Sequence, residues 1–207
     1  MRTHHFRPEL RDRLGRHLSA HDRVAINNTE LSRAAVAVVV MEGDQGAGFV
    51  LTRRSRGMRA HSYQYALPGG RLDPGETAEG AAERELAEEV GLAAGPNEIV
   101  GLLDDYETRS GYVITPVVFW IDNGAALRPE PAEVDEAYVV ELAELDRPDS
   151  PRWVDIDESD RPVLQLPIHN RLIHAPTGAI LYQFREVAMH GRCVRLGGVE
   201  EPVWAWR

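Results

Sequence analysis

Residues 70–92 read GRLDPGETAEGAAERELAEEVGL, and this stretch carries most of the information about fold and chemistry. The DPG triplet at residues 73–75 is typical of a turn. Thr77 is a suitable helix N-cap, good helix formers follow it, and Gly91 is suited to a left-handed C-cap. The stretch therefore predicts a loop, a helix of about three to four turns and a second loop.

The predicted helix has two distinct faces. Apolar residues recur at every fourth position, at Ala78, Ala82, Leu86 and Val90, and this stripe should face a core. Glu85, Glu88 and Glu89 form a second stripe with spacings of three and four residues, where like charges repel. Three glutamates alone are also typical of a solvated helix face, but a hard divalent cation such as Mg²⁺ would remove the repulsion.

The same stretch resembles the Nudix box, whose pattern is Gly-x5-Glu-x7-Arg-Glu-apolar-x-Glu-Glu-x-Gly-apolar. The matching positions are Gly70, Glu76, Arg84, Glu85, Leu86, Glu88, Glu89, Gly91 and Leu92. Members of this family hydrolyse a nucleoside diphosphate linked to another group and use Mg²⁺ or Mn²⁺. The resemblance implies the Nudix fold, an α/β/α sandwich with a mixed central sheet and a loop–helix–loop catalytic motif. It also implies a small-molecule nucleoside diphosphate substrate.

The resemblance assigns roles within the motif. Metal ligation and catalysis fall to the three glutamates of the charged stripe, and the backbone carbonyl of Gly70 is a further ligand. Arg84 is counted among the catalytic residues, although its first expected role is to pair with Glu76 and brace the loop against the helix. Gly70, Glu76 and Gly91 are therefore expected to be structural within the motif.

Arginines are concentrated just before the motif, in the segment LTRRSRGMRAHSYQYALPGG at residues 51–70. Guanidinium groups match phosphate oxygens in a bidentate geometry, so the cluster suits a phosphate-rich substrate; the alternative is a solvated basic loop. The segment resembles the signature of Nudix coenzyme A diphosphatases. Its matches are Leu51, Thr52, Arg54, Ser55, Arg59, Pro68, Gly69 and Gly70, whereas Val50, Tyr63 and Leu67 depart from it. The predicted substrate-binding residues are Arg53, Arg54, Arg59 and Tyr63, the last as a face for adenine stacking.

Three functions remain open at this point. The first is hydrolysis of the pyrophosphate of coenzyme A or its thioesters, which gives adenosine 3′,5′-bisphosphate and 4′-phosphopantetheine. The second is a Nudix pyrophosphatase for another substrate, such as ADP-ribose or a dinucleotide. The third is a non-catalytic ligand sensor, but such domains generally lose the carboxylates that are all present here. In this family a carboxylate outside the box often completes the metal site, and Glu133, Asp135 and Glu136 are the candidates.

Composition limits the partners and the compartment. The net charge of −10 argues against non-specific nucleic-acid binding, and no apolar run is long enough to span a membrane. The single cysteine, Cys193, excludes an internal disulfide and suits a reducing cytoplasm. The N-terminus lacks the apolar core of a signal peptide. Four scattered histidines are expected at the surface: His4, His5, His17 and His21.

We expect a single domain over residues 1–207, with an N-terminal helix at about residues 8–20. A buried strand is expected at 34–41, and further strands are expected at 49–52, 99–103, 112–121 and 138–142. Pro116 suggests that its strand is an edge or contains a bulge. Residues 146–207 form a divergent C-terminal extension, with strands expected at 164–168, 179–189, 193–196 and 203–206. The alternating tryptophans near its end suit a core or a homodimer interface.

Overall fold

The computed structural model describes residues 4–55 and 64–205. Their main sheet has eight strands, and the order of its central path is β3-β2-β1-β7-β5. The pairing of β1 with β7 is parallel, whereas β2, β4, β5, β6 and β8 join by antiparallel pairing, so the sheet is mixed. The strands are β1 (Ser32–Glu42), β2 (Ala47–Arg54), β3 (Tyr65–Ala66), β4 (Gly69–Arg71), β5 (Ile99–Leu102), β6 (Tyr106–Glu107), β7 (Tyr112–Trp120) and β8 (Val134–Glu141).

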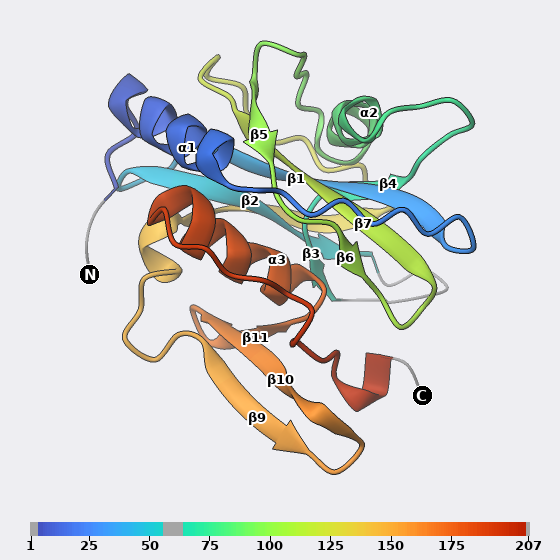
Figure 1. The fold of residues 1–207 in the computed structure, drawn as a ribbon. Coiled ribbons are helices and arrows are strands. Elements are labelled where there is room, and N and C mark those ends of the chain that lie inside the picture. The colour runs from blue at the N-terminus through green and yellow to red at the C-terminus, as the bar shows by residue number, and fades with distance from the viewer. Residues whose placement is uncertain (1–3, 56–63, 206–207) are drawn as a thin grey trace.

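Helices cover both faces of this sheet (Figure 1). On one face α2 (Ala78–Val90) packs its apolar stripe against alternate residues of β1, including Ala37 and Val39. On the other face α1 (Pro8–Ala20) and α3 (Thr177–Gln183) share a core with Val38 and Val40. Because β1 is buried on both sides, its sequence is apolar at nearly every position instead of alternating. The predicted α/β/α sandwich with a mixed sheet is confirmed.

The ends of α2 follow the predicted capping chemistry. The Thr77 side chain accepts a hydrogen bond from the backbone N–H of Gly80 at 3.1 Å, which satisfies one of the unpaired donors of the first turn. At the other end Gly91 adopts φ 67° and ψ 20°, a left-handed conformation that is costly for residues with a Cβ. The caps therefore set where the helix begins and ends, and with it which glutamates face the site.

The C-terminal extension contains a second, three-stranded sheet in the order β11-β10-β9, which lies on the side of α3 away from the main sheet (Figure 1). Its strands are β9 (Arg152–Ile156), β10 (Ser159–Ile168) and β11 (Arg171–His174). The structure contradicts the strand predicted at residues 179–189, which form α3 and a π-helical continuation, Phe184–Met189. Ile180, Phe184 and Val187 are buried at helical spacing, so burial on one face of a helix decided against their β propensity.

Two smaller predictions also fail. Residues 203–205 form a 3-10 helix instead of an edge strand, and residues 193–196 are not in a strand. Pro116 lies in β7, which is an inner strand and not an edge, but the pairing of this strand with β5 contains a register shift between Ile99 and Gly101, in keeping with the predicted irregularity. Beside Pro116 the antiparallel partner of β7 changes from β5 to β6, with Leu102 paired to Val117 and Tyr106 to Ile114. Proline has no backbone N–H to donate to a neighbouring strand, and it is tolerated here because the regular pairing of β7 is interrupted at this position.

In the part of the chain that the structure describes, no helix combines the length and apolar character needed to cross a bilayer.

Candidate metal and nucleotide site

The loop before α2 is braced against the helix by one arginine and one glutamate. Arg84 donates through Nε to Glu76 Oε1 at 3.0 Å and through NH2 to Glu76 Oε2 at 3.1 Å. Its NH2 also donates to the backbone carbonyl of Arg71 at 3.0 Å. Glu76 in turn accepts from the backbone N–H of Asp73 at 2.9 Å. These bonds lower the pKa of Glu76, with Arg84 as the main cause, and they give both residues the bracing geometry expected of them.

Three carboxylates meet beside this loop. One oxygen from each of Glu85, Glu89 and Glu133 lies within 4.8 Å of the others. Glu85 and Glu89 are one helical turn apart on α2, while Glu133 comes from the turn before β8. Carboxylate oxygens are the hard ligands that Mg²⁺ and Mn²⁺ prefer, and the rest of an octahedral shell would come from waters and substrate phosphates, so the residues present fit such an ion.

Backbone hydrogen bonds hold the turn that carries Glu133. The N–H of Glu130 donates to the carbonyl of Glu89 at 2.9 Å, which ties the turn to the end of α2. The N–H of Ser55 donates to the carbonyl of Glu133 at 2.8 Å, and its hydroxyl donates to the carbonyl of Ala132 at 3.0 Å. Glu133 is thus positioned by α2 on one side and by the end of β2 on the other.

Burial makes this cluster electrostatically costly without a cation. Glu89 is only 3% exposed, and burial raises its pKa to about 7. The Arg54 guanidinium, 3.7 Å from Glu89 Oε1, and the backbone N–H of Gly69 partly oppose this shift. The pKa of Glu85 is also raised, first by burial. Like charges that share a site disfavour joint ionisation, and a bound cation would reverse that preference.

Two other predicted ligands lie differently. Glu88 is outside the three-carboxylate group; its side chain is 58% exposed and accepts from Arg84 NH1 at 3.0 Å. Gly70 pairs with Ala35 in the sheet, and a Cβ added at Gly70 would collide with the Glu85 carboxylate. The glycine therefore leaves the space that this carboxylate occupies. Ligation by Glu88 and by the Gly70 carbonyl stays a prediction.

The arginines before the motif separate into two environments. Arg53 forms ion pairs with Asp135 at 2.7 Å and with Glu136 at 2.8 Å. These pairs link the adjacent strands β2 and β8 and engage all three side chains. Arg54 instead faces the carboxylate cluster, and its buried Nε has no hydrogen-bond partner among the described residues. A buried unsatisfied donor is costly. Arg54 is therefore a better candidate than Arg53 to donate a hydrogen bond to a phosphate oxygen. Arg59 and Tyr63 lie outside the described residues.

A cavity of about 460 Å³ opens beside Arg54, Gly69 and Gly70, within the usual volume range of small-molecule sites. Its lining is mainly apolar, and part of its wall comes from the C-terminal extension through residues 175–177 and Trp204. The sequence did not indicate these wall residues, because they lie more than 80 positions from the motif and match no pattern.

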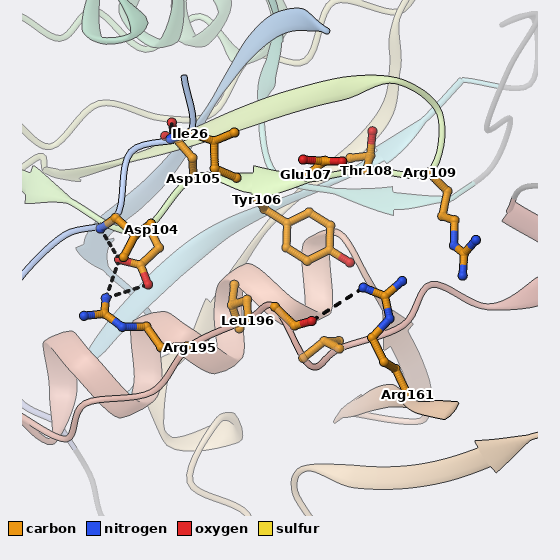
Figure 2. A pocket seen from close by; sticks show the side chains of 13 residues that line it. Ile26, Asp104, Asp105, Tyr106, Glu107, Thr108, Arg109, Arg161, Arg195 and Leu196 are labelled. Carbon is orange, nitrogen blue, oxygen red and sulfur yellow. Dashed lines mark hydrogen bonds and ion pairs between the residues drawn. The ribbon is translucent and has the colours of Figure 1, made fainter. Parts of the chain in front are cut away.

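A second cavity, of about 680 Å³, lies between the β5–β6 segment and the chain after α3 (Figure 2). Several of its charged residues are paired: Arg195 lies 2.9 Å from Asp104, and Arg161 lies 2.9 Å from Glu200. Figure 2 shows the Arg195–Asp104 ion pair, which joins distant parts of the chain at this cavity. Although it is larger, this cavity is lined by none of the motif glutamates, and we assign the chemistry to the cavity beside Gly70.

Known proteins share this combination of fold and motif. A family model described as NUDIX domain matches residues 31–162, more than half of the 207 residues. The chain therefore belongs to the Nudix family. A structure described as a MutT/nudix family protein from Enterococcus faecalis superposes with a TM-score of 0.57 at 16% identity, covering 86% of this chain and 73% of that one. At this identity the likeness shows the fold alone.

Two curated relatives extend the comparison. The protein described as uncharacterized Nudix hydrolase NudL of Photorhabdus laumondii is 36% identical over 108 residues, covering 52% of this chain and 58% of the relative. Nudix hydrolase 3 of Caenorhabditis elegans is 33% identical over 129 residues, covering 62% and 54%. The chain thus spans little more than half the length of these relatives, and their names specify no substrate.

Proposed function

We propose that the chain is a metal-dependent Nudix hydrolase that cleaves the phosphoanhydride of a nucleoside diphosphate linked to another group. The meeting of Glu85, Glu89 and Glu133 within 4.8 Å carries this proposal. These carboxylates would hold Mg²⁺ or Mn²⁺, and Arg54 supplies positive charge beside them. A bound divalent cation supplies charge neutralisation for the diphosphate and lowers the pKa of an attacking water.

The reaction is a displacement at one phosphorus of the diphosphate. A water oxygen bonds to that phosphorus, the bridging P–O bond breaks, and the other phosphate leaves with the bond's electron pair. The carboxylate cluster accepts the proton of the water; since these groups titrate together, the proton belongs to the cluster and not to one glutamate. Arg54 steadies phosphate oxygens, and the Glu76–Arg84 brace keeps the loop in place.

Within this class we propose coenzyme A or its thioesters as the substrate, supported by the run of matches from Leu51 to Gly70. ADP-ribose or a dinucleotide is the alternative, which the departure at Tyr63 and the divergent C-terminal extension keep open. Arg59 is proposed to read the 3′-phosphate of coenzyme A. The single-domain arrangement, a reducing cytoplasmic setting and a homodimer are further proposals.

Turnover in the presence of Mg²⁺ tests the function. Glu85→Gln and Glu89→Gln should each lower kcat by about 100-fold or more, because charge stabilisation at phosphate is lost. Glu79→Gln, on the same helix but outside the cluster, is the matched control and should stay near wild type. No turnover of any nucleoside diphosphate derivative by the wild-type protein would identify a ligand-sensing domain instead. A direct comparison of coenzyme A with ADP-ribose decides between the two substrate classes.

A further inference from the structure

The cavity beside the carboxylate cluster has two chemically different ends. At one end lie the side chain of Arg54 and the backbone of Gly69 and Gly70, next to the glutamates. The wall contributed by the C-terminal extension is mainly apolar and includes Pro176, Ile180 and Trp204, with Thr177 and the buried Glu201 as its polar members. A ligand with a diphosphate at one end and a poorly hydrated group at the other would match this division.

Trp204 is the large aromatic residue of that wall. It is 55% exposed, although an indole would normally lose free energy by contact with water. Its ring is held by an edge-type contact with His174, with ring centroids 5.6 Å apart and planes at 87°. The indole also borders an adjoining cavity of about 260 Å³. An anchored but exposed aromatic face beside an apolar cavity is the arrangement that stacks a nucleobase.

Positive charge at the end of the cavity nearest Gly70 supports a ligand orientation in which the diphosphate lies at that end. The Arg71 guanidinium lies over the Tyr112 ring, 5.0 Å from its centroid, and donates to the Tyr112 hydroxyl. Among the described residues no carboxylate forms an ion pair with Arg71. Both residues line the cavity, so Arg54 and Arg71 supply cations at the phosphate end while Trp204 supplies an aromatic face elsewhere.

We propose that Trp204 is a specificity-determining residue on which the nucleobase of the substrate stacks. This inference rests on the proposed function, and it narrows the substrate to compounds whose base can extend from the diphosphate to the C-terminal wall. It also gives the C-terminal extension a role in the site, since the aromatic platform lies outside the residues that match the family model.

Equilibrium binding tests the proposal without turnover. The probes are α,β-methylene-ADP, which carries a base on a non-hydrolysable diphosphate analogue, and methylenediphosphonate, which has no base, both in the presence of Mg²⁺. Trp204→Ala should weaken binding of the first by about 5-fold to 150-fold, the range for loss of one base–aromatic stack. Binding of methylenediphosphonate should be unchanged, and Trp204→Phe should restore most of the affinity for the nucleotide analogue.

Trp153 provides a matched control, because it is a 47% exposed tryptophan of β9 with its own edge-type contact to Tyr182. Trp153→Ala should bind both probes like the wild type. Equal weakening of both probes by Trp204→Ala, or an unchanged affinity for the nucleotide analogue, would overturn the proposal. Base-dependent binding that Trp204→Ala abolishes, in a protein without turnover, would refute the proposed hydrolysis and leave the stacking role standing.

Discussion

Glu89 is a carboxylate that the fold has removed almost completely from water. It sits at the buried end of the charged stripe and accepts one backbone hydrogen bond, from Gly69 at 3.2 Å. The same burial that raises its pKa would strengthen the attraction of its ionised carboxylate for a cation, since electrostatic interactions are stronger where water is excluded. Glu88, one position earlier, is exposed and paired with Arg84, so the two adjacent glutamates meet opposite environments.

This contrast predicts how stability depends on pH in metal-free protein. Glu89 has a folded-state pKa of about 7 against an ordinary value of 4.5. Because the unfolded state ionises first, folding stability falls as pH rises between those values. With metal chelated, the free energy of unfolding should drop by on the order of 2 kcal/mol from about pH 5 to about pH 8. Urea denaturation at both pH values measures this change.

Glu89→Gln should flatten that dependence, because the amide does not titrate. Glu88→Gln is the matched control at the preceding position of the helix and should keep the wild-type slope. A Glu89→Gln protein that still lost as much stability over the same interval would show that another group is responsible.

At the scale of elements, α2 is a helix whose position is set by its ends. Its Thr77 cap, its left-handed Gly91 and the hydrogen bonds from Arg84 to the preceding loop fix the helix relative to the sheet. These are local contacts within one stretch of sequence, which explains why the loop–helix–loop unit could be predicted without knowledge of the fold. The elements of the C-terminal extension have no such local determinants.

Removal of the cap should therefore cost stability more than chemistry. Thr77→Ala should lower the free energy of unfolding by about 1 kcal/mol, the usual cost of losing an N-cap hydrogen bond. Thr77→Ser keeps the hydroxyl and should lie near the wild type. Urea unfolding gives the stability, and kcat at saturating substrate is expected to change little for either variant. A loss of stability in Thr77→Ser equal to that in Thr77→Ala would contradict the assignment of the cap.

At the scale of the whole molecule, two adjacent aspartates connect the N-terminal segment, the sheet and the C-terminal extension. Figure 2 shows the bond of Asp104 to Arg195. Asp104 lies 2.9 Å from His21 Nε2 and accepts from Gln183 Nε2 at 2.8 Å. Asp105 accepts from Arg23 NH2 at 2.5 Å and from Thr115 Oγ1 at 2.7 Å. Both carboxylates are buried, so each loses hydration that these partners replace.

The network contradicts the expectation that all four early histidines lie at the surface. The His21 side chain is only 3% exposed against Asp104, and the His4 side chain is 7% exposed, 3.0 Å from Asp146. Their sequence positions carried no sign of this, because each partner lies more than 80 residues away. Each imidazole packs against a carboxylate that is itself largely shielded from water, Asp146 with 12% and Asp104 with 4% side-chain exposure.

Asp104→Asn should destabilise the protein by about 3–5 kcal/mol, the usual cost of removing one partner of a buried ion pair. Burial opposes ionisation of Asp104, but the bonds from Val24, Arg195 and His21 outweigh it and lower its pKa. Its contribution is therefore present above the ordinary aspartate value and is lost as pH falls through the lowered pKa. Urea unfolding at neutral and acidic pH measures both effects, with Asp12→Asn on the exposed side of α1 as control.

Much of the main sheet was predictable, because β1 and β7 are long apolar runs whose burial on both faces leaves little choice of structure. Residues 179–189 were not predictable in the same way. They are apolar enough for a strand, and only packing against α1 and the sheet selects their helical spacing. For the site, spacing along one helix indicated Glu85 and Glu89. Only the tertiary structure shows that Glu133 joins them, while the neighbouring Asp135 and Glu136 pair with Arg53.

The amino-acid sequence alone determined the family motif, its caps, its brace and the presence of a cluster of carboxylates, since all of these depend on residues within about one helix length. Tertiary structure decided which carboxylates meet, which arginine faces them and which residues wall the cavity. The physical reason is that these contacts join β2, α2, the turn at Glu133 and the C-terminal extension. Segments so far apart are brought together only by burial of the shared core, and no local pattern records their proximity.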